Sequence, residues 1–263
     1  MSDDEKMARI FITGSADGLG KIAAGLLIKE GHRVIVHGRN QQRAEEALKA
    51  LPGAENAVSG DLSVIQETRG LADQVNELGT MDAVIHNAGI GYRENKLVFT
   101  HDSLPPVFAV NSVAPYILTC LINKPRRLIY ISSGLHRNGD GSLVDLTWKN
   151  RSWDGFKAYS DSKLHNVLLA FAVAERWNDV LSNAMEPGWV ATKMGGSGGS
   201  DDLEEGARTQ AWLAVSNDRE ALHTGKYFYH MHVQRSHPVT TNTMVQNKLL
   251  TEYERITGIS FPG

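Results

Sequence analysis

Short apolar runs alternate along this chain with longer segments whose apolar residues recur at helical spacing. The run "RIFIT" at 9–13 is followed by "GKIAAGLLIKE" at 20–30, and "HRVIVHG" at 32–38 by "QQRAEEALKAL" at 41–51. Strands that alternate with helices are joined by right-handed crossovers, so the strands lie parallel and helices cover both faces of their sheet. The pattern therefore predicts an α/β fold with one doubly wound parallel sheet.

The remaining elements follow in the same order. We expect further strands at 55–61, 81–89, 126–133, 180–188 and 225–230. We expect further helices at 64–78, 103–122, 156–177 and 203–216.

Composition narrows the class of protein. With 263 residues, 41% hydrophobic and 22% charged, the chain can build one large core that needs no disulfide or metal. A net charge of −3 indicates neither nucleic acid nor an anionic membrane as a partner. We expect a disordered lead at 1–7 and a single domain at 8–263, without a signal peptide or membrane span. The one cysteine, Cys120, fits a reducing cytoplasm.

A glycine-rich turn, "TGSADGLG", follows the first predicted strand and opens the first predicted helix. Glycines at 14, 18 and 20 allow a tight turn, let the backbone approach a pyrophosphate and direct the helix N-terminus toward its charge. A purely structural turn is the alternative. Its place inside a βαβ unit favours dinucleotide binding.

The segment "YSDSK" places Tyr159 and Lys163 four residues apart on the clearest predicted helix. Residues at this spacing lie on the same helix face. A nearby ammonium favours a phenolate, so we expect the pKa of Tyr159 to fall from about 10 toward the working pH of a general acid. The same spacing also arises by chance in many helices. Ser132 and Ser133 end a predicted strand where open α/β sheets bind ligands, which favours the catalytic interpretation.

Several motifs together resemble the short-chain dehydrogenase/reductase family, in its retinol-dehydrogenase-like branch, a family with a Rossmann-like fold. They are "TGSADGLG", "GDL" at 60–62, "HNAG" at 86–89, Asn111, "ISS" at 131–133, "YSDSK" and "PGWVATKM" at 187–194. The resemblance implies that Tyr159 is the proton donor, Ser133 orients the substrate oxygen and Lys163 binds the nicotinamide ribose. It implies that Asn111 holds a water in a proton relay, although a satisfied buried amide is an equal alternative.

The resemblance and the fold also imply a nicotinamide cofactor. The second predicted strand ends in "VIVHGRN", which has no carboxylate for an NAD ribose and offers Arg39 to a 2′-phosphate. This favours NADP (NADPH), although Asp17 would repel a phosphate. The expected cofactor-binding residues are Gly14, Ser15, Gly18, Leu19, Gly20, Arg39, Asp61, Leu62, Asn87, Ala88, Gly89, Tyr159, Lys163, Pro187, Gly188, Val190 and Thr192.

The sequence thus predicts an NADP-dependent carbonyl reductase or alcohol dehydrogenase. The alternatives are a catalytically idle NADP sensor or scaffold, and another reaction on the same fold, such as dehydration or dehalogenation. No metal is expected, because the histidines at 223–237 lack metal-ligand spacing. Substrate choice is assigned to 134–158 and 189–205, with an apolar or aromatic substrate suggested by Trp148, Trp153 and Trp189. The helix before the fifth strand is short for this branch, which leaves monomer or homo-oligomer undecided.

Overall fold

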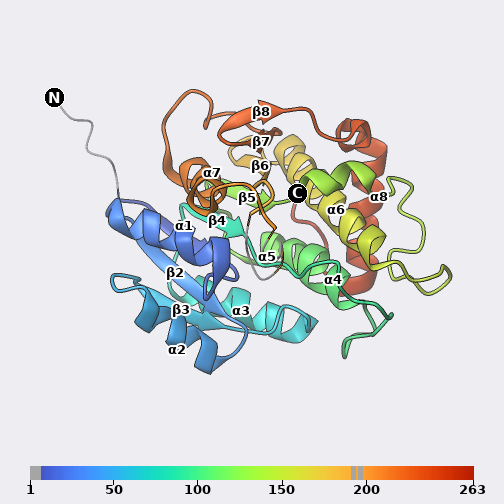
Figure 1. Cartoon of the computed structure of the whole chain (residues 1–263), viewed down its shortest axis with the longest axis horizontal. Helices are drawn as coiled ribbons and strands as arrows, with labels where there is room; N and C mark the ends of the chain where they lie inside the picture. The colour runs from blue at the N-terminus through green and yellow to red at the C-terminus, as the bar shows by residue number, and fades with distance from the viewer. Residues whose placement is uncertain (1–6, 191–193, 195–197) are drawn as a thin grey trace.

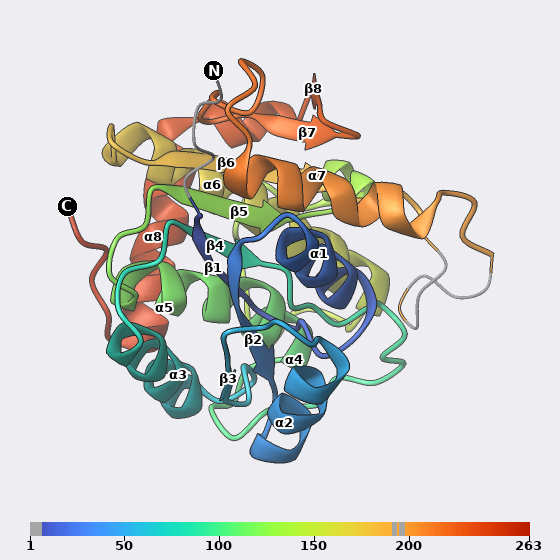
Figure 2. The ribbon, with the colours of Figure 1, turned by 90° about the vertical axis from the view of Figure 1, so that its left-hand side faces the viewer.

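An eight-stranded sheet forms the centre of the molecule (Figure 1). The computed structural model describes residues 7–190, 194 and 198–263. The strand order is β3-β2-β1-β4-β5-β6-β7-β8, which runs from bottom to top in Figure 2. Only β8 pairs antiparallel with its neighbour among these strands. The strands are β1 Arg9–Ile12, β2 Arg33–Gly38, β3 Asn56–Ser59, β4 Ala83–His86, β5 Arg127–Ile131, β6 Leu181–Glu186, β7 Tyr227–Tyr229 and β8 His232–Gln234.

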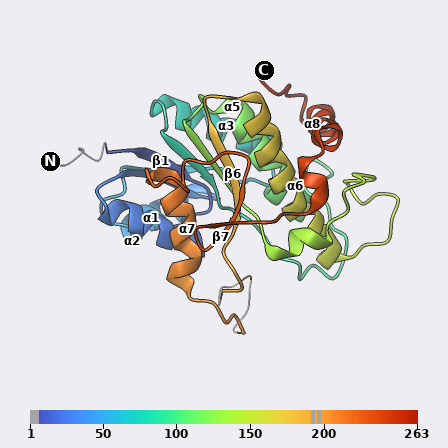
Figure 3. The same cartoon turned by 90° about the horizontal axis from the view of Figure 1, so that it is seen from above.

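The helices form one layer on each face of the sheet (Figure 3). The layer that contains α1, α2 and α7 covers one face, and the layer of α3, α5, α6 and α8 covers the other. The helices are α1 Gly18–Lys29, α2 Gln41–Ala50, α3 Ile65–Glu77, α4 Pro106–Phe108, α5 Ala114–Leu121, α6 Gly155–Arg176, α7 Leu203–Val215 and α8 Thr243–Thr257, with shorter turns η1 Ala109–Val113, η2 Gly134–Asn138 and η3 Pro238–Thr241.

Two hydrophobic cores result from the alternation of side chains along the strands. In β1, Ile10 and Ile12 pack against the α1 layer, whereas Phe11 packs against the α3 layer. Successive strand residues point to opposite faces, so a strand buried on both faces reads as a continuous apolar run. This explains why "RIFIT" shows no polar alternation.

The predicted doubly wound α/β fold in a single domain is confirmed. Strand order reverses at β1, because β2 lies on one side of it and β4 on the other. In such sheets a crevice opens beyond the carboxyl ends of the strands at this switch point, where ligands bind. The fold therefore places its main binding region after β1 and β4.

The structure differs from the prediction in three elements. The expected helix at 103–122 begins at Pro106 and contains a wider turn, η1, at Ala109–Val113. Strand β8 was missed because its three residues are all exposed and have no apolar pattern. Helix α8 was also missed, although Asn242 caps its start and Gly258, with φ 68°, ends it.

None of the described helices combines the length and the apolar character needed to cross a membrane. The expected disordered lead falls largely on residues 1–6, which lie outside the described residues.

Candidate active site

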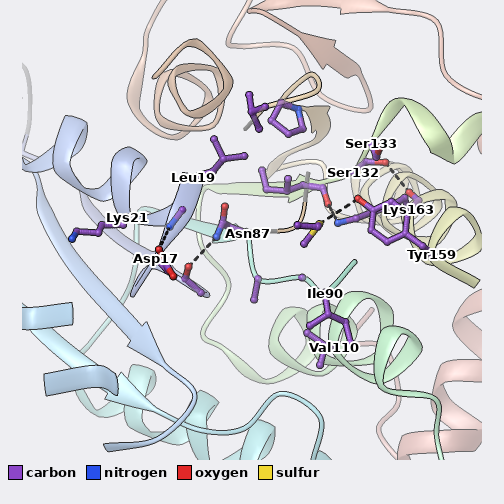
Figure 4. A pocket seen from close by; sticks show the side chains of 18 of the residues that line it. Asp17, Leu19, Lys21, Asn87, Ile90, Val110, Ser132, Ser133, Tyr159 and Lys163 are labelled. Carbon is purple, nitrogen blue, oxygen red and sulfur yellow. Dashed lines mark hydrogen bonds between the residues drawn. The ribbon is translucent and has the colours of Figure 1, made fainter. Parts of the chain in front are cut away.

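A cavity of about 1490 Å³ opens where the parallel strands end. Its lining includes Gly14 after β1, Arg39 after β2, Gly89 after β4, Ser133 after β5 and Gly188 after β6. Figure 4 shows Asp17 and Lys21 on one side of this pocket and Ser133, Tyr159 and Lys163 on the other, with Asn87 between them. One space therefore connects the glycine turn with the predicted proton donor.

The glycine turn fits tightly against the loop after β4. A Cβ on Gly14, whose φ is +64°, would lie 2.9 Å from the Cα of Ala88. A Cβ on Gly20 would lie 2.3 Å from Nδ2 of Asn87, and this amide donates to the carbonyl of Thr13 at 2.9 Å. Any other residue at either glycine would push α1 away from β4. The turn thus holds the N-terminus of α1 against the cavity, where its free N–H groups can bind an anion.

His37, which was not among the predicted site residues, links the glycine turn to Gly60, the residue that follows β3. Its Nδ1 accepts a hydrogen bond from the Gly14 N–H at 2.9 Å, and its Nε2 lies 2.9 Å from the carbonyl of Gly60. These partners require the neutral ring with its proton on Nε2. Burial lowers the pKa of His37 to about 4, which keeps it neutral. The sequence feature that could have identified His37 is its position as a polar residue inside the apolar run "VIVHG".

The end of the cavity near β2 carries positive charge. Arg39 is exposed and lines it, and Lys21 and Arg43 line it as well. Arg43 is held by Glu46, with Nη1 and Oε2 2.6 Å apart. Asp17 adds a negative charge to the same region, and it caps α1 by accepting the Gly18 N–H at 2.9 Å. The lining therefore combines three cations with the carboxylates of Asp17 and Asp61.

Tyr159 and Ser133 meet at the other end. The Tyr159 hydroxyl is buried, 3.7 Å from Sδ of Met194, to which it donates. Burial raises the pKa of Tyr159 to about 12, although a hydrogen bond with Ser133 opposes the rise. Ser133 also accepts the N–H of Leu135 at 3.2 Å, which starts η2. The expected fall of the Tyr159 pKa does not occur in this structure, because desolvation outweighs the neighbouring groups.

Lys163 lies below the ring of Tyr159. Its Nζ is 5.5 Å from the ring centre and donates to the carbonyl of Ile131 at 2.9 Å. The side chain is 3% exposed, and burial lowers its pKa to about 8. The ammonium is therefore costly to keep charged at this position, and a carbonyl is the partner that holds it.

Asn111 is a fully buried amide in η1. Its Oδ1 accepts the Ile90 N–H at 2.8 Å, while its Nδ2 donates to the Ile90 carbonyl and to Ser162 Oγ, both at 3.0 Å. Both ends of the amide therefore have protein partners, which corresponds to the second alternative from the sequence, a satisfied buried amide. Asn111 nevertheless lies close to Lys163, since a Cβ on Gly89 would be 3.3 Å from both Oδ1 and Nζ.

Most of the predicted site residues line the cavity, and three of the described ones do not. Ser15 and Gly20 are buried behind its wall, where Ser15 Oγ donates to the carbonyl of Ile12. Asn111 is likewise behind the wall, and Thr192 lies outside the described residues. The predicted residues that do line it are Gly14, Gly18, Leu19, Arg39, Asp61, Leu62, Asn87, Ala88, Gly89, Ser133, Tyr159, Lys163, Pro187, Gly188 and Val190.

Of the three candidate tryptophans, one lines the cavity and two pack elsewhere. Trp189 lines the cavity and is 55% exposed. Trp148 and Trp153 instead pack in a small core behind Tyr159, where their ring centres are 5.2 Å apart. These two tryptophans therefore serve core packing and do not line the cavity. Within the described part of the chain, no group of three or more histidine, cysteine or acidic side chains is arranged to hold a metal.

Several known proteins are similar to this chain over nearly its whole length. A family model described as short chain dehydrogenase matches residues 8–202. An uncharacterised oxidoreductase of Emericella nidulans is 44% identical over 98% of this chain and 100% of its own length. The short-chain dehydrogenase chyC of Penicillium rubens is 43% identical over 97% of this chain and all of its own. Retinol dehydrogenase 14 of Homo sapiens is 29% identical over 95% of this chain and 86% of its own.

Solved structures give the same architecture. An uncharacterised protein from Mycobacterium paratuberculosis superposes with a TM-score of 0.84 and 25% identity over 97% of this chain and 95% of that one. A blue fluorescent protein from a metagenomic library, solved in complex with NADPH, has a TM-score of 0.68 over 84% of this chain and 95% of that one. At 20% identity the second likeness bears on the fold alone.

Proposed function

The chain belongs to the short-chain dehydrogenase/reductase family, and we propose that it is an NADP-dependent carbonyl reductase. One observation carries the proposal. A single cavity is lined at one end by the glycine turn and Arg39 and at the other by Ser133 and Tyr159. A dinucleotide bound at the glycine turn would extend toward Ser133 and Tyr159. The reacting carbonyl would then lie beside the Tyr159 hydroxyl.

The cavity suits NADP in shape and charge. The N-terminus of α1, held by Gly14 and Gly20, offers N–H groups to the pyrophosphate. Arg39 and Arg43 would bind the 2′-phosphate, and Asp61 and Leu62 would border the adenine, since all four line the cavity. Gly89, Lys163 and the segment from Pro187 to Val190 would hold the nicotinamide riboside. When bound, the nicotinamide supplies the hydride in reduction and accepts it in oxidation.

The protein's own groups handle the proton. In reduction, Ser133 donates a hydrogen bond to the substrate oxygen and holds it beside Tyr159. Tyr159 transfers its hydroxyl proton to that oxygen, so the carbonyl becomes an alcohol and the phenolate remains. A pKa of about 12 keeps Tyr159 protonated until this step. Lys163 stabilises the phenolate by its charge.

A catalytically idle NADP sensor is the second candidate. One observation favours it: the Tyr159 hydroxyl donates to Met194 rather than facing an open approach. The presence of Ser133 beside the same hydroxyl favours catalysis, because binding a nucleotide needs no such pair. In either case we propose one domain over residues 8–263, and a cytoplasmic location that rests on the single Cys120.

Thermal unfolding with NADPH and with NADH tests the cofactor. A ligand that binds only the folded state raises the melting temperature by mass action, so NADPH should raise it by several degrees and NADH by less. Arg39→Ser should remove most of this difference, while Arg219→Ser, at an exposed arginine outside the cavity, should leave it. Equal stabilisation by both nucleotides would remove the assignment of NADP. Oxidation of NADPH in the presence of ketones, aldehydes and quinones then separates the reductase from the sensor.

A further inference from the structure

Aromatic rings gather at the Tyr159 end of the cavity. Tyr92, from the loop after β4, lies between Tyr159 and Phe156, which is in the first turn of α6. The ring centre of Tyr92 is 5.5 Å from that of Tyr159 at an interplanar angle of 68°, and 5.8 Å from that of Phe156 at 72°. Both contacts have the edge-to-face geometry that aromatic pairs prefer.

The two loops that carry these rings are fixed to each other. Trp153 donates its indole N–H to the carbonyl of Glu94 at 2.8 Å. A Cβ on Gly155 would lie 2.7 Å from the Glu94 carbonyl oxygen and 3.0 Å from that of Tyr92. The loop after β4 thus packs directly on the start of α6, and Tyr92 and Phe156 are held in place before a ligand enters. Such preorganised rings bind a ligand at low entropic cost.

The remaining lining at this end is apolar or acidic. Ile90, Val110 and Leu135 line it beside the aromatic rings. The carboxylate of Glu186 also lines the cavity and pairs with Arg137 at 3.4 Å. The cations that line the cavity, Lys163 apart, lie at the glycine-turn end among the described residues: Lys21, Arg39 and Arg43. Lys163 itself is buried and donates to Ile131. In the part of the chain that the structure describes, an anionic substrate therefore has little to attract it near Tyr159.

From this arrangement we infer that the substrate is a neutral carbonyl compound with an aromatic ring beside the reacting group. Tyr92 and Phe156 form an aromatic clamp that contacts this ring, and they are the specificity-determining residues. The inference rests on the proposed function, because the clamp places the carbonyl of its ligand next to Ser133 and Tyr159.

Turnover with matched ketones tests the clamp. The kcat/KM values for acetophenone, cyclohexyl methyl ketone and phenylglyoxylate with NADPH are measured in the wild type and in Phe156→Leu, Tyr92→Leu and Tyr92→Phe. We expect the ratio of acetophenone to cyclohexyl methyl ketone to fall at least about fivefold in each leucine variant, because each lost ring contact weakens aromatic binding. Tyr92→Phe should keep the ratio. Comparison of ratios removes the intrinsic difference in reactivity between the two ketones.

The matched control is Phe99→Leu, since Phe99 is 49% exposed and does not line the cavity. It should leave the ratio unchanged. An unchanged ratio in both Phe156→Leu and Tyr92→Leu, or a preference for the anionic phenylglyoxylate in the wild type, would overturn the inference.

Binding separates a failed inference from a failed function. Calorimetry in the presence of NADP⁺ compares 2-acetylnaphthalene with its saturated analogue 2-acetyldecalin. If no ketone is reduced but 2-acetylnaphthalene binds more tightly and Phe156→Leu abolishes the difference, the clamp stands and the reductase proposal fails. Equal binding of the two compounds to the wild type rejects the clamp whether or not turnover occurs.

Discussion

Nζ of Lys163 donates a hydrogen bond to the carbonyl of Ile131 at 2.9 Å, at the end of β5. The same ammonium is 5.5 Å from the ring centre of Tyr159. A hydrogen bond thereby ties the buried cation to the last residue of β5, two residues before Ser133, while the cation remains one helical turn from the phenol. Burial acts in opposite directions on the pKa values of the two groups, raising that of the phenol and lowering that of the lysine. Burial therefore disfavours the charged form of each group, the phenolate of Tyr159 and the ammonium of Lys163.

Lys163→Met should make the protein more stable and less active. The pKa of Lys163 falls from 10.5 to about 8 in the folded chain, and one pKa unit corresponds to about 1.4 kcal/mol. Part of this gain is offset by the lost hydrogen bond, so we expect the free energy of unfolding at pH 7 to rise by about 1 to 3 kcal/mol. Turnover should fall at least about 100-fold. Urea unfolding and NADPH oxidation measure the two effects.

The advantage of Lys163→Met should shrink as the pH rises from about 8 to 10.5. In this window the unfolded chain still holds the lysine proton while the folded chain has released it, so the wild type gains stability with pH. Lys157→Met, at an exposed position on the same helix, is the control and should change neither stability nor activity much. A destabilised Lys163→Met protein at pH 7 would show that the ammonium is not costly.

His37→Leu should weaken cofactor binding without removing catalysis. The variant leaves the Gly14 N–H without its acceptor and the glycine turn without its support at Gly60. Loss of one partner of a buried hydrogen bond costs about 1 to 3 kcal/mol, so we expect the Kd for NADPH to rise at least about fivefold while kcat at saturating NADPH stays within a factor of three. His101→Leu, at an exposed loop position, should leave both unchanged. A fall in kcat with an unaltered Kd would contradict this role.

Acid should unfold the protein through its buried histidines. Their folded-state pKa values lie below the ordinary 6.5 because burial penalises the charged ring, so the unfolded chain binds more protons below that pH. Stability should therefore fall as the pH decreases from about 6.5 to 4, by at least about 2 kcal/mol between pH 7 and 5 in urea titrations. His86→Phe should reduce this dependence, and an equal slope in that variant would reject the explanation. The values are about 4 for His37 and His136 and about 3 for His86 and His165.

The fold was predictable because its strands are buried on both faces. "RIFIT" and "RRLIYISS" are apolar enough to be recognised alone, and the glycine turn between β1 and α1 fixes where the sheet reverses. The missed elements carry weaker signals: β8 has three exposed residues, and α8 has a mean polarity typical of a surface helix. Its apolar stripe, Leu249, Leu250 and Tyr253, is buried in the core beside α6, where Tyr253 also packs on Phe108 and Tyr116.

The sequence predicted which residues lie together in the cavity, but it did not predict their pKa values. Spacing alone placed Tyr159 and Lys163 on one helix face, and they do lie together. The direction of the Tyr159 pKa depends on how much protein surrounds the phenol, which spacing does not contain. His37 and Met194 were missed for the same reason, since their roles come from contacts with residues more than 20 positions away.

The protein should be a monomer in solution. Helix α6 is buried from Ala158 to Val173 within this chain, which leaves little of its surface to pair with a second copy. Helix α8 packs on it, and the C-terminal tail adds bonds from Tyr116 to the Ile259 carbonyl at 2.7 Å and from Trp177 to the Pro262 carbonyl at 3.0 Å. Light scattering after size exclusion should give a mass near 28.9 kDa. A stable dimer would show that another surface associates.

Replacement of Tyr159 by phenylalanine tests the central claim most directly. The variant removes only the hydroxyl that Ser133 contacts, so NADPH should bind with an unchanged Kd and stabilise the fold as in the wild type. We predict that kcat/KM for an accepted ketone falls at least about 100-fold, the usual contribution of a positioned proton donor. Full turnover by Tyr159→Phe with bound NADPH would contradict the account.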